Sequence, residues 1–222
     1  IVVCIDEFQQ IGEFADSLTV QKRLRGVWQH HQNVSYCFFG SKKHLMENIF
    51  QSRRMPFYQF GEMLHLKCIP TEYWAPFICS RFEKFGKKIS EEYACRICQE
   101  VRNYSSYVQQ LAWNVMAETE NEVDEESFTE GLKALLEQNS SLFIQQTEGL
   151  TTYQLNFIRL LCKDIHTGFT TKAVSEIYPL GSKSNVDRIK KCLIKKEIIT
   201  IEKDGVSLAD SVFELWFKRE MM

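Results

Sequence analysis

Two adjacent carboxylates follow the first apolar run of the chain. Residues 1–5, IVVCI, lead directly into Asp6 and Glu7. Five consecutive apolar residues are typical of a buried parallel strand, and the end of a strand lets neighbouring side chains turn toward one ligand. In nucleoside triphosphatases such a pair divides the chemistry: the aspartate holds Mg²⁺ and the glutamate polarises the attacking water. For Asp6, the capping of a helix is the alternative interpretation.

Other polar residues are expected near the same edge. A second apolar and aromatic run, residues 34–40, is followed by Ser41. A small hydroxyl there would lie beside a γ-phosphate, so Ser41 is predicted to sense phosphate or water. Arg53 and Arg54 follow in a loop that could send an arginine toward that phosphate, although two solvated arginines would give the same pattern. Gln9 could also orient water, but a surface glutamine is the simpler interpretation.

Strand and helix signals alternate over residues 1–70. Residues 41–52 place apolar side chains at helical spacing, and residues 16–32 are compatible with a helix. Residues 63–69, MLHLKCI, resemble a third strand that Pro70 closes. The order strand, helix, strand, helix, strand implies right-handed crossovers and a parallel sheet.

Strand signals disappear over residues 71–148. Thr71, Ser90 and Asp124 are candidate N-caps, and apolar residues recur at helical spacing behind each of them. The acidic stretch ETENEVDEE is typical of a solvated loop before a helix. These residues therefore predict a small helical bundle.

Residues 149–222 have a different pattern. Two runs with alternating apolar residues flank Asp204–Gly205, which predicts a β-hairpin. Helical patterns precede and follow this hairpin, at residues 151–165, 170–178, 182–197 and 209–219. Three helices and a two-stranded wing predict a winged helix-turn-helix.

The third of these helices is basic on its exposed side. Its candidate DNA-binding residues are Lys183, Arg188, Lys191 and Lys195. Residues 150–222 carry 12 basic and 9 acidic side chains, whereas residues 1–149 carry 15 and 20, so the C-terminal segment is the better place for a DNA contact. In DNA-binding winged helices the third helix enters the major groove. The wing EKDG has mixed charge, however, and packing against the chain's own nucleotide domain is the alternative.

Several segments taken together resemble one family. IVVCIDEFQQI, FFGSKKHLMENIF, MPFYQF, NYSSYVQQLAWNV and the C-terminal basic segment follow one another in the order found in AAA+-like archaeal and bacterial ATPases of the signal-transduction (STAND) class. The resemblance covers essentially the whole chain. It implies that Asp6 is the Walker B magnesium ligand, Glu7 the catalytic base and Ser41 the sensor. It also implies ATP and Mg²⁺ as cofactors of the intact parent, a lid at residues 71–148 and a winged helix at residues 149–222.

The sequence departs from this family at two places. Ser105 stands where the lid motif usually has proline, and no two of the ten glycines are spaced as in the phosphate loop GxxxxGK[ST]. The chain is therefore expected to be the C-terminal part of a longer ATPase, beginning at the Walker B strand and binding nucleotide weakly or not at all by itself. A strand would then be missing beside residues 63–69. Either the N-terminal part of the same nucleotide domain supplies that strand, or this region rearranges or pairs with a second copy of the chain.

The predicted fold class is α/β plus α: an incomplete parallel-sheet P-loop ATPase core, a helical lid bundle and a C-terminal winged helix-turn-helix. No apolar run approaches the length of a membrane span, and no leader is recognisable, so we expect a cytoplasmic protein. Cys95 and Cys98 form a CxxC without a second pair, which favours buried thiols over a metal site. The favoured function is the C-terminal portion of an ATP-driven molecular switch. The alternatives are a winged-helix DNA-binding regulator and a non-catalytic module that contacts a protein partner.

Overall fold

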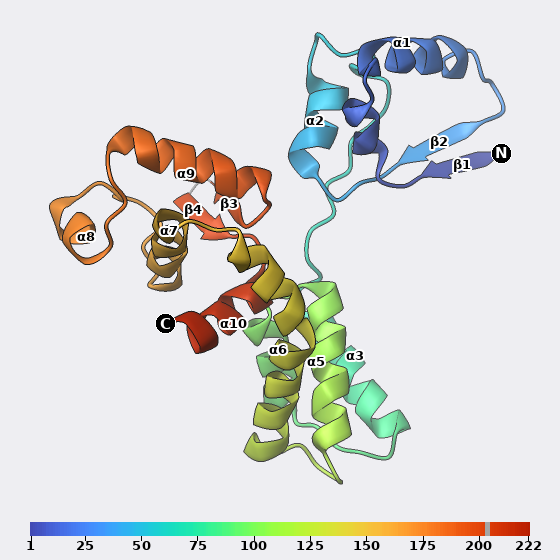
Figure 1. Ribbon diagram of the computed structural model, residues 1–222. Coiled ribbons are helices and arrows are strands. Elements are labelled where there is room, and N and C mark those ends of the chain that lie inside the picture. The colour runs from blue at the N-terminus through green and yellow to red at the C-terminus, as the bar shows by residue number, and fades with distance from the viewer. Residues whose placement is uncertain (203–204) are drawn as a thin grey trace. The chain divides into compact units, whose positions relative to one another are not determined.

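A computed structural model describes residues 1–202 and 205–222 of the chain. The chain divides into two compact units, Ile1–Leu66 (unit 1) and Lys67–Met222 (unit 2). In Figure 1, unit 1 runs from dark blue to turquoise, and unit 2 continues from turquoise to red. Among the described residues, no helix combines the length and the apolar character that a membrane span requires.

Unit 1 contains a small parallel sheet. Strand β1 (Val2–Ile5) pairs in parallel with β2 (Ser35–Phe38), as the two apolar runs predict. The 3-10 helix η1 (Phe8–Glu13) and helix α1 (Ser17–Trp28) form the crossover between the strands, and α2 (Lys43–Gln51) follows β2. The predicted alternation of strand and helix is confirmed up to α2.

An aromatic cluster covers one face of this sheet. Phe8 lies at its centre, with its ring centroid 4.3 Å from that of Phe38 and 5.4 Å from that of Phe57. Trp28 of α1 stacks on Phe38 at 5.4 Å. Because exposed and half-buried residues alternate along both strands, the other face of the sheet remains open. Parallel sheets are normally covered on both faces.

The predicted third strand is wrong. Residues 63–69 form neither a strand nor a helix, and Leu64 and Leu66 are 79% and 97% exposed. A strand is stabilised by the hydrogen bonds of a neighbouring strand, and only β2 pairs with β1 among the described residues of unit 1. The apolar pattern of residues 63–69 therefore has no partner to pair with.

Four helices begin unit 2. Ser90 accepts the Tyr93 N–H as the N-cap of the second helix, and Asp124 forms a capping box with Ser127 at the start of the fourth. The predicted cap at Thr71 is displaced by one residue, because Pro70 is the N-cap. The helices are α3 (Thr71–Lys84), α4 (Glu91–Glu100), α5 (Ser105–Glu118) and α6 (Glu125–Glu148).

The C-terminal part of unit 2 adds four helices and a hairpin. Strand β3 pairs antiparallel with β4, and Gly205 begins β4 with a φ of 137°, which favours glycine. Asp204, the other residue of the predicted turn, lies outside the described residues. The elements are α7 (Thr152–Cys162), α8 (Lys172–Ile177), α9 (Lys183–Lys195), β3 (Ile199–Glu202), β4 (Gly205–Leu208) and α10 (Ser211–Met221).

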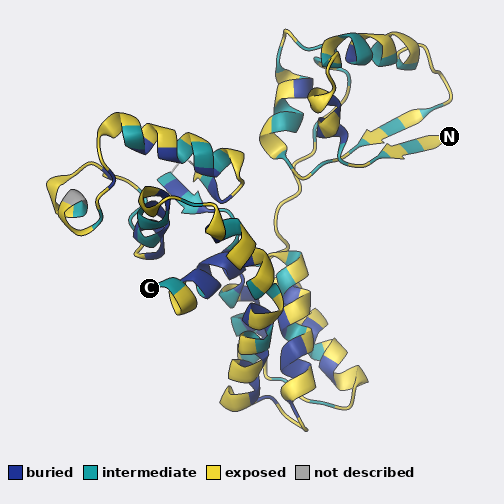
Figure 2. Cartoon of the chain, in the orientation of Figure 1, coloured by how far each residue is buried: buried dark blue, intermediate teal, exposed yellow. Residues whose placement is uncertain are grey.

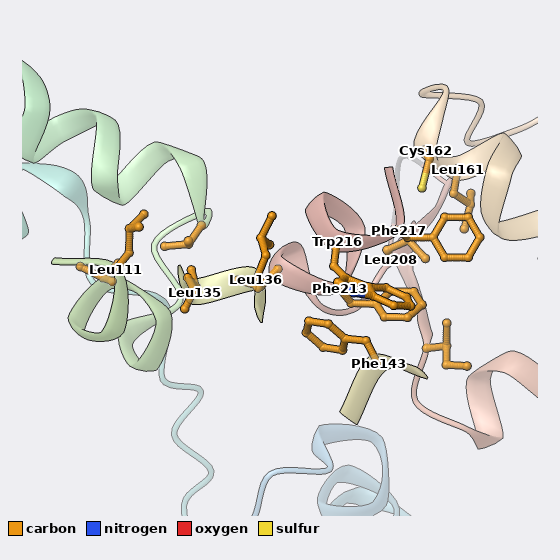
Figure 3. Close-up of a cluster of buried hydrophobic side chains, with 14 of the residues drawn as sticks. Leu111, Leu135, Leu136, Phe143, Leu161, Cys162, Leu208, Phe213, Trp216 and Phe217 are labelled. Atoms are coloured by element: carbon orange, nitrogen blue, oxygen red, sulfur yellow. The ribbon is translucent and has the colours of Figure 1, made fainter. Parts of the chain in front are cut away.

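One hydrophobic core runs through all of unit 2. It extends from Leu111 of α5 and Leu135 of α6 to Phe143, Phe213 and Trp216, all of which are buried (Figure 3). The Phe143 and Phe213 rings meet edge to face at 5.5 Å, which joins α6 to α10. The four-helix part and the C-terminal part therefore share their packing.

Polar contacts reinforce the same junction. The Tyr107 hydroxyl of α5 donates to Asp210 Oδ2 at 2.6 Å, and Arg102 Nη2 donates to Glu214 Oε2 at 2.6 Å. The Glu214 side chain is buried and also accepts from Lys218 Nζ at 2.6 Å. Burial and the bond to Asp210 raise the pKa of Tyr107. The segment before and at the start of α5 is thereby tied to α10.

Candidate functional site

The candidate site begins where β1 ends. The chain leaves the strand through Asp6, whose Oδ1 accepts the Glu7 N–H at 2.7 Å. Glu7 has a φ of 48° and a ψ of 40°, the left-handed conformation that residues other than glycine seldom adopt. Such backbone strain concentrates at functional sites. Here the turn directs the chain from the sheet edge into η1.

The structure brings Glu7 and Ser41 together. Glu7 Oε1 lies 3.3 Å from the Ser41 backbone nitrogen, and Glu7 Oε2 lies 3.2 Å from Ser41 Oγ, with both groups donating to the carboxylate. The parallel register pairs Ile5 with Phe38, so the two strands end at the same edge. Two predicted site residues that are 34 positions apart therefore face each other.

Gln9 completes this cluster. Its Nε2 donates to Glu7 Oε2, and the residue is only 2% exposed. The interpretation of Gln9 as a surface residue is therefore wrong. Gly40 makes room for it, since a Cβ on Gly40 would stand 1.8 Å from Gln9 Oε1. With donors on both oxygens, the Glu7 carboxylate is held in one orientation.

Asp6 is exposed at the same edge. Carboxylate and hydroxyl oxygens are the ligands that Mg²⁺ prefers, and proteins often supply only one or two carboxylates while phosphates and water complete the shell. Among the described residues there is no group of three or more His, Cys, Asp or Glu side chains that could hold a metal by themselves. Asp6 therefore fits a magnesium ion that is shared with a phosphate ligand.

Arg54 is not part of this cluster. It is exposed and makes no hydrogen bond or ion pair with the described residues. Arg25 of α1, which the sequence analysis did not single out, holds the following loop by donating to the carbonyls of Pro56 and of Tyr58, the latter at 2.9 Å. Its guanidinium also lies 5.6 Å from the centre of the Phe60 ring. No sequence signal indicates contacts across more than 30 positions.

The four candidate DNA-binding residues all lie on α9 and are exposed. The opposite face of α9 buries Val186, Ile189 and Leu193 in the core of unit 2. Arg188 Nη2 donates to Asn185 Oδ1 at 2.8 Å. The amphipathic packing of α9 thus leaves a basic face open to solvent.

The CxxC lies on α4. Cys98 is buried and donates to the Ala94 carbonyl, with a sulphur–oxygen distance of 3.2 Å. Burial raises the pKa of the Cys98 thiol to about 11. Because metals bind the thiolate, this environment opposes a metal ligand at Cys98.

Comparisons with known proteins identify solved structures with a similar fold. No family model and no curated protein matches the sequence. The structure is similar to the Walker-type ATPase of Pyrococcus abyssi, with a TM-score of 0.74, 13% identity and 98% of this chain covered. It is also similar to the RuvB Holliday junction branch migration motor of Thermotoga maritima, with a TM-score of 0.50 and 13% identity over 98% of this chain and 68% of that one.

These similarities show a P-loop ATPase-like fold with helices and a small parallel sheet. The chain spans 63% of the length of the Pyrococcus abyssi protein. At 13% identity the resemblance concerns the fold alone.

Proposed function

We propose that the chain is the C-terminal portion of an ATP-binding and ATP-hydrolysing molecular switch of the STAND class. In this proposal residues 1–70 belong to the nucleotide-binding core, residues 71–148 form the lid and residues 149–222 form a winged helix. The observation that carries the proposal is the meeting of Glu7 and Ser41 at the carboxyl edge of two parallel strands. Ligands of open parallel sheets bind outside that edge.

Each site residue has a separate role in the proposed reaction. Glu7 accepts a proton from, or orients, the attacking water, because its carboxylate is fixed by donors from Ser41 and Gln9. Ser41 positions that water or the γ-phosphate, and Asp6 holds the cation. When bound, Mg²⁺ would neutralise part of the negative charge on the phosphates. Arg54, exposed and unpaired among the described residues, is free to reach a phosphate.

The phosphate cradle is proposed to come from outside these 222 residues, since the sequence contains no GxxxxGK[ST]. The unpaired, exposed segment 63–69 supports this idea, because an additional strand between it and β2 would supply the backbone hydrogen bonds that a strand requires. That strand belongs to the N-terminal part of the same nucleotide domain or to a second copy. The chain alone should consequently bind nucleotide weakly and be inactive.

The link between α5 and α10 supports a switch. Tyr107 of the NYSSY segment, which corresponds to the lid motif of the family, donates to Asp210 at the start of α10. Nucleotide contact at the lid motif would be transmitted through this bond and the shared core. Unit 2 would then respond to nucleotide as one body.

Nucleotide binding and hydrolysis test the proposal. In the product of the complete gene, Glu7→Gln should retain ATP binding and lower the hydrolysis rate by about 10²- to 10⁴-fold, the usual contribution of a general base. Glu13→Gln, which removes the same charge at the exposed end of η1, is the matched control and should leave the rate unchanged. Unchanged ATP turnover in Glu7→Gln would show that Glu7 is not the general base. ATP turnover by the 222 residues alone would refute the external cradle.

A second candidate function is DNA binding, because the basic face of α9 is open to solvent. Lys183, Arg188, Lys191 and Lys195 would contact phosphates, and each contact should add about 0.9 to the slope of log affinity against log salt. Lys191→Gln should lower that slope, whereas Lys22→Gln in α1 should not. Affinity that does not vary with salt concentration would exclude this function.

A further inference from the structure

We propose that a cavity between α3 and α5 of unit 2 binds a small aromatic carboxylate. The cavity measures about 520 Å³, within the range of about 300–1,000 Å³ typical of small-molecule sites. Its lining comes from α3 and α5, with Phe85 after α3 and Gln138 from α6. None of these residues belongs to the cluster of Glu7, Gln9 and Ser41, which we call the Glu7 cluster. The inference is therefore independent of the proposed ATPase.

Aromatic rings form the walls. Phe77 of α3 and Trp113 of α5 both line the cavity and are exposed, Trp113 by 60%. The rings of Phe85 and Trp113 meet edge to face at 6.1 Å, which fixes one side of the opening. Exposed aromatic side chains grouped around one cavity indicate a binding surface rather than scattered apolar residues. A planar ring would cover them and stack against them.

Arg81 gives the cavity its charge. It is the one ionisable residue in a lining that otherwise consists of apolar and amide side chains. Its guanidinium lies 4.8 Å from the centre of the Phe77 ring and makes no ion pair with the described residues. A guanidinium binds a carboxylate through two parallel hydrogen bonds. The ligand is therefore expected to be an anion with its charge next to an aromatic ring.

Trp74 supplies a second polar group. It lines the cavity, is only 7% exposed, and its indole N–H has no acceptor among the described residues. Asn114 and Gln138 satisfy each other through two hydrogen bonds of 3.2 and 3.3 Å, so neither serves the indole. A buried donor without a partner is unfavourable. The indole nitrogen is itself covered by protein, so a ligand oxygen reaches this N–H only after a small shift of the lining; the bond would then remove the penalty and orient the ligand.

Calorimetric titration of the 222-residue chain tests the site with two probes of the same shape, 2-naphthoate and the neutral 2-naphthamide. The carboxylate should bind at least about tenfold more tightly than the amide, as a charge-assisted hydrogen bond implies. Arg81→Gln should abolish that preference. Arg23→Gln removes the same charge from exposed α1 in unit 1 and should preserve it. Equal affinity for the two probes, or a preference that survives in Arg81→Gln, would overturn the proposal.

Two further variants test the walls and the indole. Trp113 is 60% exposed, and Trp113→Ala should weaken the binding of both probes by about tenfold or more, because it removes one wall. Trp74→Phe keeps the ring and removes the N–H, so it should weaken 2-naphthoate several-fold. If Trp113→Ala leaves both affinities unchanged, the ligand binds elsewhere and the proposal is wrong. If Trp74→Phe has no effect, the indole does not donate to the ligand.

Discussion

Unit 1 and unit 2 bury their apolar side chains to different degrees (Figure 2). Among the described residues of unit 1, the buried apolar side chains are those of Phe8, Ile11, Ile49 and Phe57. The core of unit 2 is continuous from Trp74 to Phe217. Unit 1 also leaves apolar side chains open to solvent, including those of Val2 in β1 and of Leu64 and Leu66.

The unit with the larger hydrophobic core is not the unit that carries the candidate catalytic residues. Unit 2 closes its own core, whereas unit 1 has a sheet covered on one face and carries the Glu7 cluster. Functional elements are often drawn from the less stable parts of a protein. We therefore expect the site geometry to depend on additional cover over the open face of the sheet, while unit 2 keeps its structure without help.

A substitution at Gly131 should have the largest effect on stability, and it should destabilise unit 2 but not unit 1. Gly131 of α6 lies against α5, and a Cβ there would stand 2.7 Å from the Val115 backbone nitrogen and 2.8 Å from its Cα. Backbone atoms cannot rotate away, so Gly131→Ala should lower the free energy of unfolding of unit 2 by about 3 kcal/mol. Urea denaturation with amide exchange resolved by residue measures this loss.

The control for Gly131→Ala is Glu130→Ala on the same helix. Glu130 is exposed and, among the described residues, forms an ion pair only with Lys133, at 3.0 Å, so its loss should change the stability of unit 2 by about 0.5 kcal/mol or less. If Gly131→Ala also lowered amide protection in β1 and β2, the two units would unfold together and the comparison would fail.

A smaller effect is expected at Tyr107. Tyr107→Phe removes the bond to Asp210 and should lower the stability of unit 2 by about 1 kcal/mol at pH 8. Because the folded pKa of Tyr107 is raised above its unfolded value of about 10, this contribution is complete below pH 10 and is lost as the pH rises further, since the unfolded chain ionises first. The difference between wild type and Tyr107→Phe should therefore stay constant up to about pH 10 and shrink as the pH rises from 10 to 11.

Denaturation at several pH values tests this prediction, with Tyr153→Phe as the control. Tyr153 is an exposed tyrosine of α7, so its substitution should leave both the stability and its pH dependence nearly unchanged. A difference for Tyr107→Phe that stays constant up to pH 11 would contradict the linkage.

Local patterns predicted much of the fold. Apolar runs identified β1 and β2, and helical spacing with capping residues such as Ser90 and Asp124 located the helices of unit 2. The pairing of the two strands also placed Ser41 near Glu7, because parallel strands end at a common edge. Each of these features depends on residues that are close in sequence or on the pairing of β1 with β2.

The failures depend on contacts between distant residues. Segment 63–69 has a strand pattern, yet the strand state requires a partner that the pattern does not contain. The burial of Gln9 depends on the space left by Gly40. The bond from Tyr107 to Asp210 crosses 103 positions, so no local signal could indicate it.

The smallest effect should be a gain in the stability of unit 1. Gly26 lies inside α1, is exposed, and a Cβ there would meet no atom within 4 Å. Gly26→Ala should therefore stabilise α1 by about 0.5–1 kcal/mol through lower entropy of the unfolded chain. Amide exchange should slow in α1 and in the sheet it covers, while protection in α5 and α6 stays the same. Equal slowing in unit 2 would show that the units form one cooperative structure, and absence of any slowing in α1 would mean that this helix does not limit the stability of unit 1.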